Sequence, residues 1–189
     1  MRIVRHPRLT TALTLAAALS VTLAMPASAV NTVTQTINPG TLSSSIADLT
    51  LGDVSYSHIA QASTGTMVLT ADDSSGTGDG WNVTVQGSAF VYSGPNGGTN
   101  IPAASFSITG AAAPTMTAGE AVDGSDGPMV PTTFTAPATL DSARKTMQAN
   151  ANFGEGTYNQ NLSVSLAIPA QSRVGTYTGT MTVTISSGP

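Results

Sequence analysis

Cysteine is absent from this 189-residue sequence, and charged side chains make up only 8% of it. The lack of cysteine excludes a disulfide scaffold, a thiol nucleophile and a thiolate metal site. Soluble domains ordinarily carry about 25% charged residues, so membrane proteins and disordered chains have to be considered first. The mean hydropathy of +0.12 is too low for a protein with several membrane spans. The net charge of −4 is too small for disorder driven by charge repulsion.

Aromatic residues are also scarce, at 5% of the sequence, and basic residues number only six. Thr, Ser, Ala and Gly take the place of charge, which is typical of an exported β protein with a polar, uncharged surface. Beyond the first eight residues, the basic side chains are Arg144, Lys145 and Arg173. Three cations cannot form a stripe that binds phosphates, which excludes nucleic acid as a partner.

The first 29 residues have the pattern of a secretory signal peptide. Three arginines in the first eight residues precede an uncharged apolar run over 9–25, and Pro26-Ala27-Ser28-Ala29 forms a small-residue cleavage site. The alternative is a membrane anchor, but a run of about 17 residues is at the short limit for crossing a bilayer. Cleavage after Ala29 predicts a secreted chain of residues 30–189. Loss of the three arginines changes its net charge from −4 to −7.

Apolar and polar residues alternate with a period of two through most of this mature chain, which indicates half-buried strands with one wet face of Thr and Ser. The clearest segments are 81–86, 104–109, 162–168 and 176–185. Turn signals rich in Gly, Pro, Asn and Asp separate them. The best helical candidate, 138–151, is expected to give no more than a turn or two. The middle segment, 93–137, is expected to be loops around one strand.

These patterns predict an all-β protein, an antiparallel β-sandwich with long Gly/Pro-rich loops, in a single domain over 30–189. Its order of segments is also familiar: Leu49-Thr-Leu-Gly-Asp-Val54, then Gly76-Thr-Gly-Asp-Gly-Trp-Asn-Val-Thr-Val85, then Gly175-Thr-Tyr-Thr-Gly-Thr-Met-Thr-Val-Thr-Ile185. This order resembles the WxL domain family of Gram-positive surface proteins. The resemblance implies an exported, non-catalytic protein that lacks a covalent anchor and associates with the cell wall without a covalent bond.

The family has two Trp-x-Leu elements, and the sequence departs from both. The first aligns with Trp81-Asn82-Val83 and the second with Met181-Thr182-Val183. These changes keep apolar residues at strand spacing. Trp81, Val83, Tyr177, Met181 and Val183 are therefore the candidate ligand-binding residues. Trp81 has two interpretations: an exposed ring that stacks on a sugar, or the central side chain of the core. The same two interpretations apply to Tyr177.

Two further groups of residues are of types that can carry chemistry. The loop containing Asp72, Asp73 and Asp79 offers oxygen ligands for calcium, but its spacing matches no EF-hand, and acidic Gly-rich loops are usually solvated turns. No metal or other cofactor is therefore expected. The mature chain has one histidine, His58, and the acids Asp141 and Glu155 have no local support as a glycosidase pair. The sequence predicts no enzyme.

Two functions remain open. The first is a secreted surface domain that binds cell-wall glycan (peptidoglycan) or another surface protein. The second is a structural or adhesive subunit that self-associates through sheet edges. The segment 176–185 lies almost at the end of the chain, and a terminal strand of this kind can pair with another molecule.

Overall fold

The computed structural model of this protein describes residues 32–189, and the predicted signal peptide (1–29) lies outside them. The chain divides into two units, 1–36 and 37–189, and the fold below is that of the second. Residues 32–189 contain strands and one short 3₁₀ helix, η1 (Ala103–Ser105), but no α-helix. Within the same range, no helix is long and apolar enough to cross a membrane.

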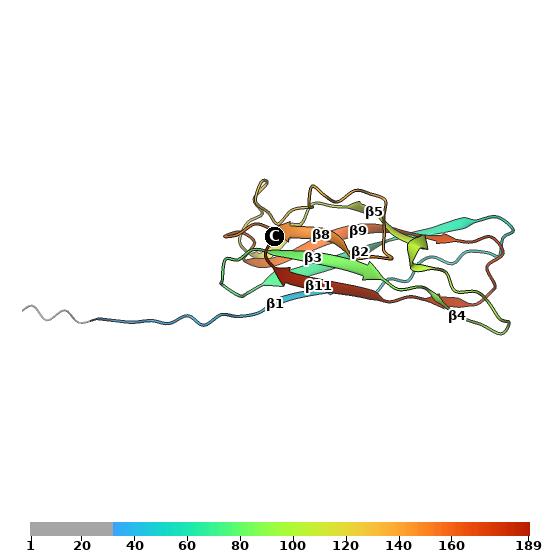
Figure 1. Ribbon diagram of the computed structural model, residues 1–189, viewed down its shortest axis with the longest axis horizontal. Coiled ribbons are helices and arrows are strands. Elements are labelled where there is room, and N and C mark those ends of the chain that lie inside the picture. Colours follow the sequence, from blue (N-terminus) through green and yellow to red (C-terminus); the bar gives the residue numbers. More distant parts are fainter. Residues whose placement is uncertain (1–31) are drawn as a thin grey trace, which may run out of the picture. The chain divides into compact units, whose positions relative to one another are not determined.

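The larger layer is an antiparallel sheet in the order β1-β2-β9-β5-β7, with β6 also paired to β9 (Figure 1). Its long axis is the pair β2–β9, which stays in register over thirteen residues, from Gln61 opposite Ile168 to Asp73 opposite Gly156. The strands are β1 (Leu42–Ile46), β2 (Gln61–Asp73), β5 (Phe106–Ala111), β6 (Thr115–Gly119), β7 (Ala138–Thr139) and β9 (Gly156–Ile168).

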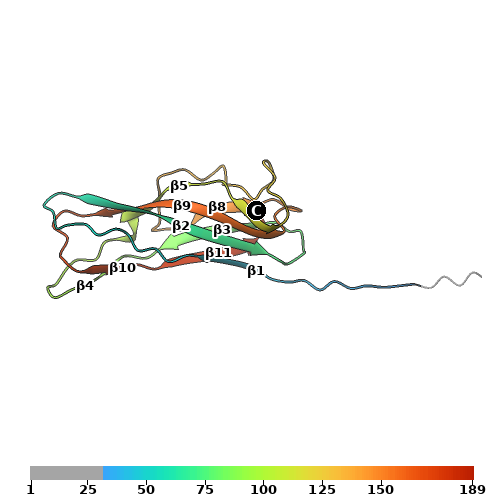
Figure 2. The same cartoon turned by 180° about the vertical axis from the view of Figure 1, so that it is seen from behind.

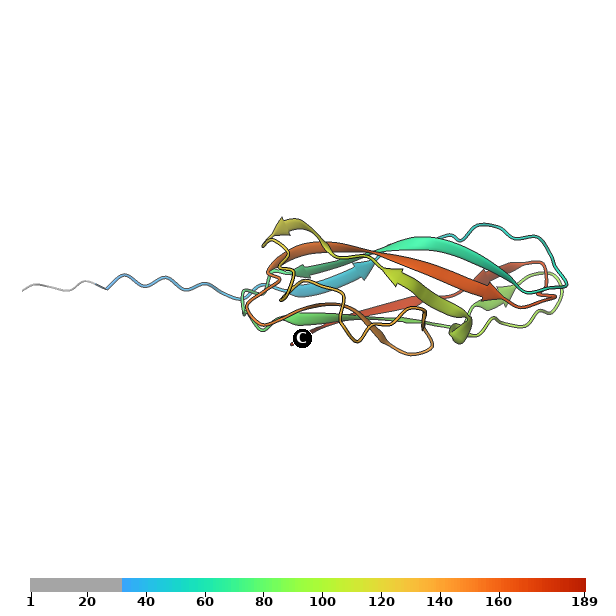
Figure 3. The same ribbon diagram turned by 90° about the horizontal axis from the view of Figure 1, so that it is seen from above.

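The second layer is a three-stranded antiparallel sheet in the order β11-β3-β8, and a two-stranded sheet, β10-β4, lies beyond one end of it (Figure 2). The strands are β3 (Trp81–Gly87), β4 (Val91–Ser93), β8 (Arg144–Ala149), β10 (Thr176–Thr178) and β11 (Met181–Ser187). Figure 3 shows the two layers edge-on. The antiparallel, all-β architecture predicted from the sequence is confirmed.

The core lies between the layers, where alternate side chains of each strand point inward. On β3, Trp81, Val83 and Val85 have no exposed surface, while the intervening Asn82 and Thr84 are half-buried. The facing side chains include Leu69 of β2 and Leu162 and Val164 of β9. Each such burial contributes about 1.5 to 3 kcal/mol relative to an exposed side chain. The period of two identified these inward faces correctly.

The C-terminal segment is two strands rather than one. β10 pairs with β4, and β11 pairs with β3. The break falls at Gly179 and Thr180, where the ring of Phe90 lies so close that a Cβ on Gly179 would be 3.2 Å from it. The Thr180 N–H donates to Ser88 Oγ at 2.9 Å instead of continuing the ladder. The alternation of residue types continues across the break, so the sequence pattern predicted one continuous strand.

Two other expectations are corrected. Residues 138–151 form β7 and β8 rather than any helical turn, because β8 pairs with β3 and buries Met147 and Ala149 in the core. The middle segment contains a second strand, β6, besides the expected one. The residues of β6 are exposed throughout, so the strand has no alternating burial that a hydrophobic pattern could reveal.

A hydrogen-bonded cluster closes the end of the sandwich near Trp81. The indole Nε1–H of Trp81 donates to the carbonyl oxygen of Gly154 at 2.9 Å, and the N–H of Gly154 donates to Glu120 Oε2 at 2.8 Å. The hydroxyl of Tyr158 donates to the carbonyl oxygen of Glu120 at 2.8 Å. The rings of Trp81 and Tyr158 are 6.1 Å apart. The cluster thus ties β3, β9 and the segment after β6 together.

Alkaline pH is expected to weaken this cluster. Burial, with the neighbouring charges of Glu120, Asp73 and Glu155, raises the pKa of Tyr158 from 10.0 to about 12. Because the folded state favours the protonated phenol, its stabilising contribution is complete below about pH 10 and is lost as the pH rises toward 12. Melting temperatures measured from pH 9 to 12 are expected to fall more steeply for the wild type than for Tyr158→Phe. Equal slopes would contradict the assignment.

Candidate functional site

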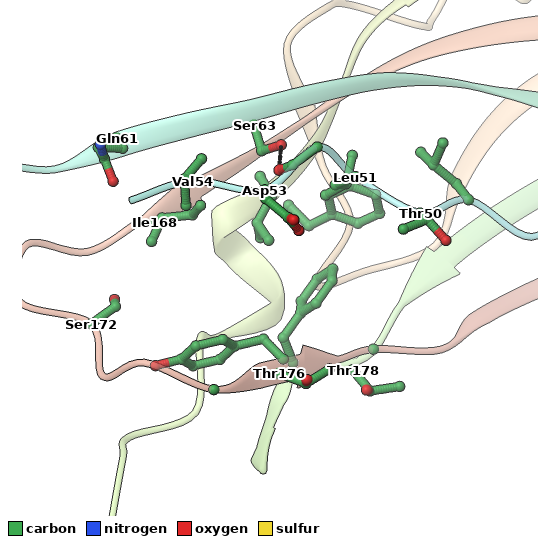
Figure 4. Close-up of a pocket in the computed structure, with 18 of the residues that line it drawn as sticks. Thr50, Leu51, Asp53, Val54, Gln61, Ser63, Ile168, Ser172, Thr176 and Thr178 are labelled. Carbon is green, nitrogen blue, oxygen red and sulfur yellow. Dashed lines mark hydrogen bonds between the residues drawn. The ribbon is translucent and has the colours of Figure 1, made fainter. Parts of the chain in front are cut away.

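A groove of about 960 Å³ opens at the end of the sandwich opposite Trp81. One wall is the segment 46–57, which begins at the last residue of β1, and the other is the segment 172–181, which contains β10. Figure 4 shows Leu51, Asp53 and Val54 on one side, with Ser172 and Thr176 across from them. The ends of β2 and β9 form part of the lining between the two walls.

Three contacts hold residues 49–57 of the first wall in place. Ser63 Oγ of β2 donates to the carbonyl oxygen of Gly52 at 3.0 Å, and the N–H of Gln171 donates to the carbonyl oxygen of Ser57 at 2.8 Å. The third is apolar: the side chains of Leu49 and Leu51 cover Gly65 of β2, where a Cβ would lie 2.8 Å from a Leu49 methyl. The missing side chain at Gly65 therefore leaves space for the segment to pack on the sheet.

The second wall is built around two tyrosines. The rings of Tyr177 on β10 and Tyr92 on β4 are 5.3 Å apart. The hydroxyl of Tyr92 donates to the carbonyl oxygen of Val174, and that of Tyr177 to the carbonyl oxygen of Arg173, both at 3.0 Å. These bonds fix the loop 173–175 against the two strands, so the wall is pre-formed by side chains of its own.

The lining combines apolar surface with neutral hydrogen-bonding groups. Its charged residues are Asp48, Asp53 and Arg173. Hydroxyl-bearing side chains come from both walls, among them Thr50, Ser55, Tyr56, Ser172 and Tyr177. Tyr56 is 53% exposed and Val54 43% exposed, so both are accessible to a ligand. A surface of this composition suits a ligand with both apolar faces and neutral donors and acceptors.

The structure distributes the five predicted ligand-binding residues over different places. Trp81 and Val83 are 0% exposed on the inner face of β3, so the geometry supports the core interpretation of Trp81. Val183 is half-buried on the inner face of β11. Only Tyr177 and Met181 line the groove. The two motif-like segments do lie on adjacent strands, but at opposite ends of the ladder, because Met181 pairs with Gly87 and Trp81 with Ser187.

The acidic loop is organised by its own hydrogen bonds. Asp73 is buried and accepts from the N–H and Oγ of Ser75, and Asp72 accepts from Ser74 Oγ and Thr157 Oγ1. The structure does not join Asp72 and Asp73 with Asp79 into a cluster. Over residues 32–189, no group of three or more His, Cys, Asp or Glu is placed to hold a metal ion.

His58, Glu155 and Asp141 also lie apart. His58 precedes β2 and packs edge-on against Tyr56, with ring centroids 5.3 Å apart. Glu155 precedes β9, at the other end of the thirteen-residue β2–β9 ladder. At about 3.3 Å per residue, that ladder separates the two by about 40 Å. Asp141 lies 3.9 Å from Arg144 in an exposed ion pair.

Sequence reasoning missed the first wall of the groove. Residues 49–54 contributed to the family resemblance, but they formed no regular strand pattern and received no role. Their alternating leucines were the available signal, since a loop that carries two apolar side chains at this spacing has to bury them against something. Tyr56, an aromatic residue in a chain with only 5% aromatics, was the second available signal.

Comparison with known proteins gives one match. The family described as WxL domain surface cell wall-binding matches residues 27–189. No curated protein and no solved structure gives a significant match to the chain.

Proposed function

We propose, from the premise that this chain belongs to the WxL family of surface cell-wall-binding domains, that its groove is where the wall is bound. The family function is established for the chain: it is a non-catalytic domain of the bacterial cell surface that binds the cell wall non-covalently. The proposal adds the location of the contact, its chemistry, and a secreted form that begins at residue 30.

The composition of the groove carries this proposal. Peptidoglycan glycan presents apolar C–H faces, acetyl methyl groups and many neutral hydroxyl and amide groups. Exposed tyrosine provides a flat apolar ring with a polar tip, and Thr and Ser hydroxyls both donate and accept hydrogen bonds. Tyr56, Tyr177, Thr50 and Ser172 bring these groups to the two walls. The groove volume lies at the upper end of the usual range for ligand sites, about 300–1,000 Å³.

A pulldown with purified Gram-positive cell walls tests the proposal. Negative charge is introduced on both walls by Val54→Glu together with Ser172→Glu. Retention on the walls is expected to fall at least tenfold, because the carboxylates have to stay hydrated at the place where the glycan would lie. Tenfold corresponds to about 1.4 kcal/mol. Walls boiled in detergent and then digested with protease carry no intact surface protein, so retention on them distinguishes glycan from a protein partner.

The matched control is Val68→Glu with Ser163→Glu, on the outer faces of β2 and β9. Val68 is 38% exposed, close to the value for Val54, and neither control residue lines the groove. The control is expected to bind like the wild type. Equal retention of both double variants would show that the groove is not the contact. A wild-type chain that is not retained, where another WxL domain is retained, would refute wall binding altogether.

A second candidate function is self-association through the edge of a sheet. β11 is the last strand of its sheet and has β3 as its sole strand partner within residues 32–189. Most of the groove lining lies outside β11, which contributes only Met181 to it, so a surface subunit could carry both functions.

A further inference from the structure

β11 carries a row of unpaired backbone groups along its outer edge. The N–H of Gly188 donates to the carbonyl oxygen of Gly80, and the N–H of Ser88 donates to the carbonyl oxygen of Thr180. The backbone N–H and C=O groups of the even-numbered residues of β11 therefore point toward β3. Because hydrogen-bonding direction alternates along an antiparallel strand, the N–H and C=O groups of Met181, Val183 and Ile185 point away from the sheet. No other described residue bonds to these groups.

The side chains on this edge are also incompletely covered. Val183 and Ile185 of β11 are half-buried, whereas Val83 and Val85 of the neighbouring β3 are fully buried. β1, the edge strand of the other sheet, approaches β11 without pairing to it, and its inward residues Leu42 and Ile46 are half-buried as well. We call this gap between β1 and β11 the seam. A natural sheet protein usually protects such an edge with charge or proline, and this one has neither.

The chain also contains a strand-like segment that lies outside the strands described above. Residues 32–37 read Thr-Val-Thr-Gln-Thr-Ile, with β-branched residues at five of six positions and no charge. Val33 and Ile37, which share one parity, are 95% and 91% exposed. Within the described residues, no hydrogen bond between backbone groups involves residues 32–39. A segment with this composition is suited to a sheet and is unfavourable as an exposed tail.

The residues that lead from this segment into β1 are held against β2. The N–H of Gly40 donates to the carbonyl oxygen of Ser75, and that of Ser74 to the carbonyl oxygen of Thr41, which continues the β1–β2 pairing past the start of β1. A Cβ on Gly40 would collide with the Ser74 carbonyl, so the close approach also requires glycine.

We propose that residues 32–37 of one copy add as a strand to β11 in the seam of a second copy. Val33 and Ile37 then cover Val183, Ile185, Leu42 and Ile46, and the unpaired backbone groups of β11 gain partners. Each copy carries one donor segment and one seam, so the contact is head-to-tail and generates a ring or a filament. The proposal concerns pairing between copies and holds whether or not the groove binds the wall.

Sedimentation of the chain from residue 30, in the absence of cell walls, tests this pairing. The wild type is expected to form concentration-dependent oligomers. Val33→Asp with Ile37→Asp is expected to be monomeric, because the two carboxylates would enter the seam. Thr34→Asp with Thr36→Asp adds the same charge to the same segment on the opposite parity, and is expected to weaken association by no more than a few-fold. All four side chains are exposed, so neither double variant disturbs the fold.

The acceptor side has its own test. Val183→Pro removes an N–H that bonds to nothing in the monomer, so a folded variant that no longer oligomerises supports the seam. A synthetic peptide of residues 30–38 is expected to dissociate the wild-type oligomers. A monomeric wild type at 100 µM, or equal behaviour of the two aspartate pairs, would overturn the proposal. So would monomers in which Val33→Asp with Ile37→Asp lowers the melting temperature, since the segment would then occupy its own seam.

Discussion

Replacing Trp81 by alanine is expected to lower the free energy of unfolding by about 3 to 5 kcal/mol, the range for large aromatic side chains removed from cores. Trp81 is fully buried, so the substitution leaves a cavity between the sheets. It also leaves the carbonyl oxygen of Gly154 without its indole donor. Domains of this size are stable by about 5 to 15 kcal/mol, so a large part of the total is lost. Thermal unfolding is expected to show a fall of roughly 10 to 15 °C.

Trp81→Phe separates the two causes. It keeps most of the apolar volume but removes the Nε1–H donor, and is expected to cost about 1 to 3 kcal/mol, the range for a buried acceptor left unsatisfied. A Trp81→Ala variant as stable as the wild type would show that this ring is not central to the core. If either variant lost wall retention while keeping its melting temperature, the ring would have a direct binding role that burial argues against.

Replacing Gly154 by alanine is the second change with a large expected effect. Gly154 has φ of +84°, which favours glycine, and a Cβ there would lie 2.5 Å from the Cβ of Ala149 and 2.9 Å from Trp81 Nε1. Backbone strain and overpacking of buried neighbours together are expected to cost about 2 to 5 kcal/mol. Urea unfolding measures this as a lower midpoint.

Gly76→Ala is the matched control for Gly154→Ala. Gly76 has φ of +66°, but nothing lies within 4 Å of its Cβ position, so the variant has the strain without the collision. Its cost is expected to be about 1 kcal/mol. Equal costs at the two positions would show that the contact with Trp81 and Ala149 is unimportant.

The sequence predicted the sheets well because in a half-buried strand the apolar residues that face the core alternate with polar residues that face solvent. Trp81, Val83 and Val85 alternate with polar residues, and the structure buries these three completely. The alternation of residue types failed to predict structure where it does not correspond to alternating burial along one continuous strand. β6 is exposed along its length, and the break at Gly179 lies against the ring of Phe90, which is distant in sequence.

The groove was harder to predict for a different physical reason. Its walls are loops, and their positions depend on single contacts such as Ser63 Oγ to the Gly52 carbonyl and Leu49 over Gly65. Contacts of this kind join residues more than ten positions apart and follow no period. Tyr177 was identified because it lies near a motif-like segment with a regular strand pattern. Val54 lay in a segment of the resemblance without such a pattern, Tyr56 lay outside it, and neither was identified. The candidate site is therefore half predicted: one wall from the sequence and the other from the structure.

The groove walls are continuous in the chain with the terminal strands, which has a mechanical consequence. The wall 46–57 leads directly out of β1, and the wall 172–181 leads directly into β11. In a copy held at its groove and pulled from the start of β1 or the end of β11, the tension would run along the backbone of the pulled strand itself. The thirteen residue pairs of β2 and β9 lie outside that path, so such a pull would leave the longest pairing of the fold unloaded.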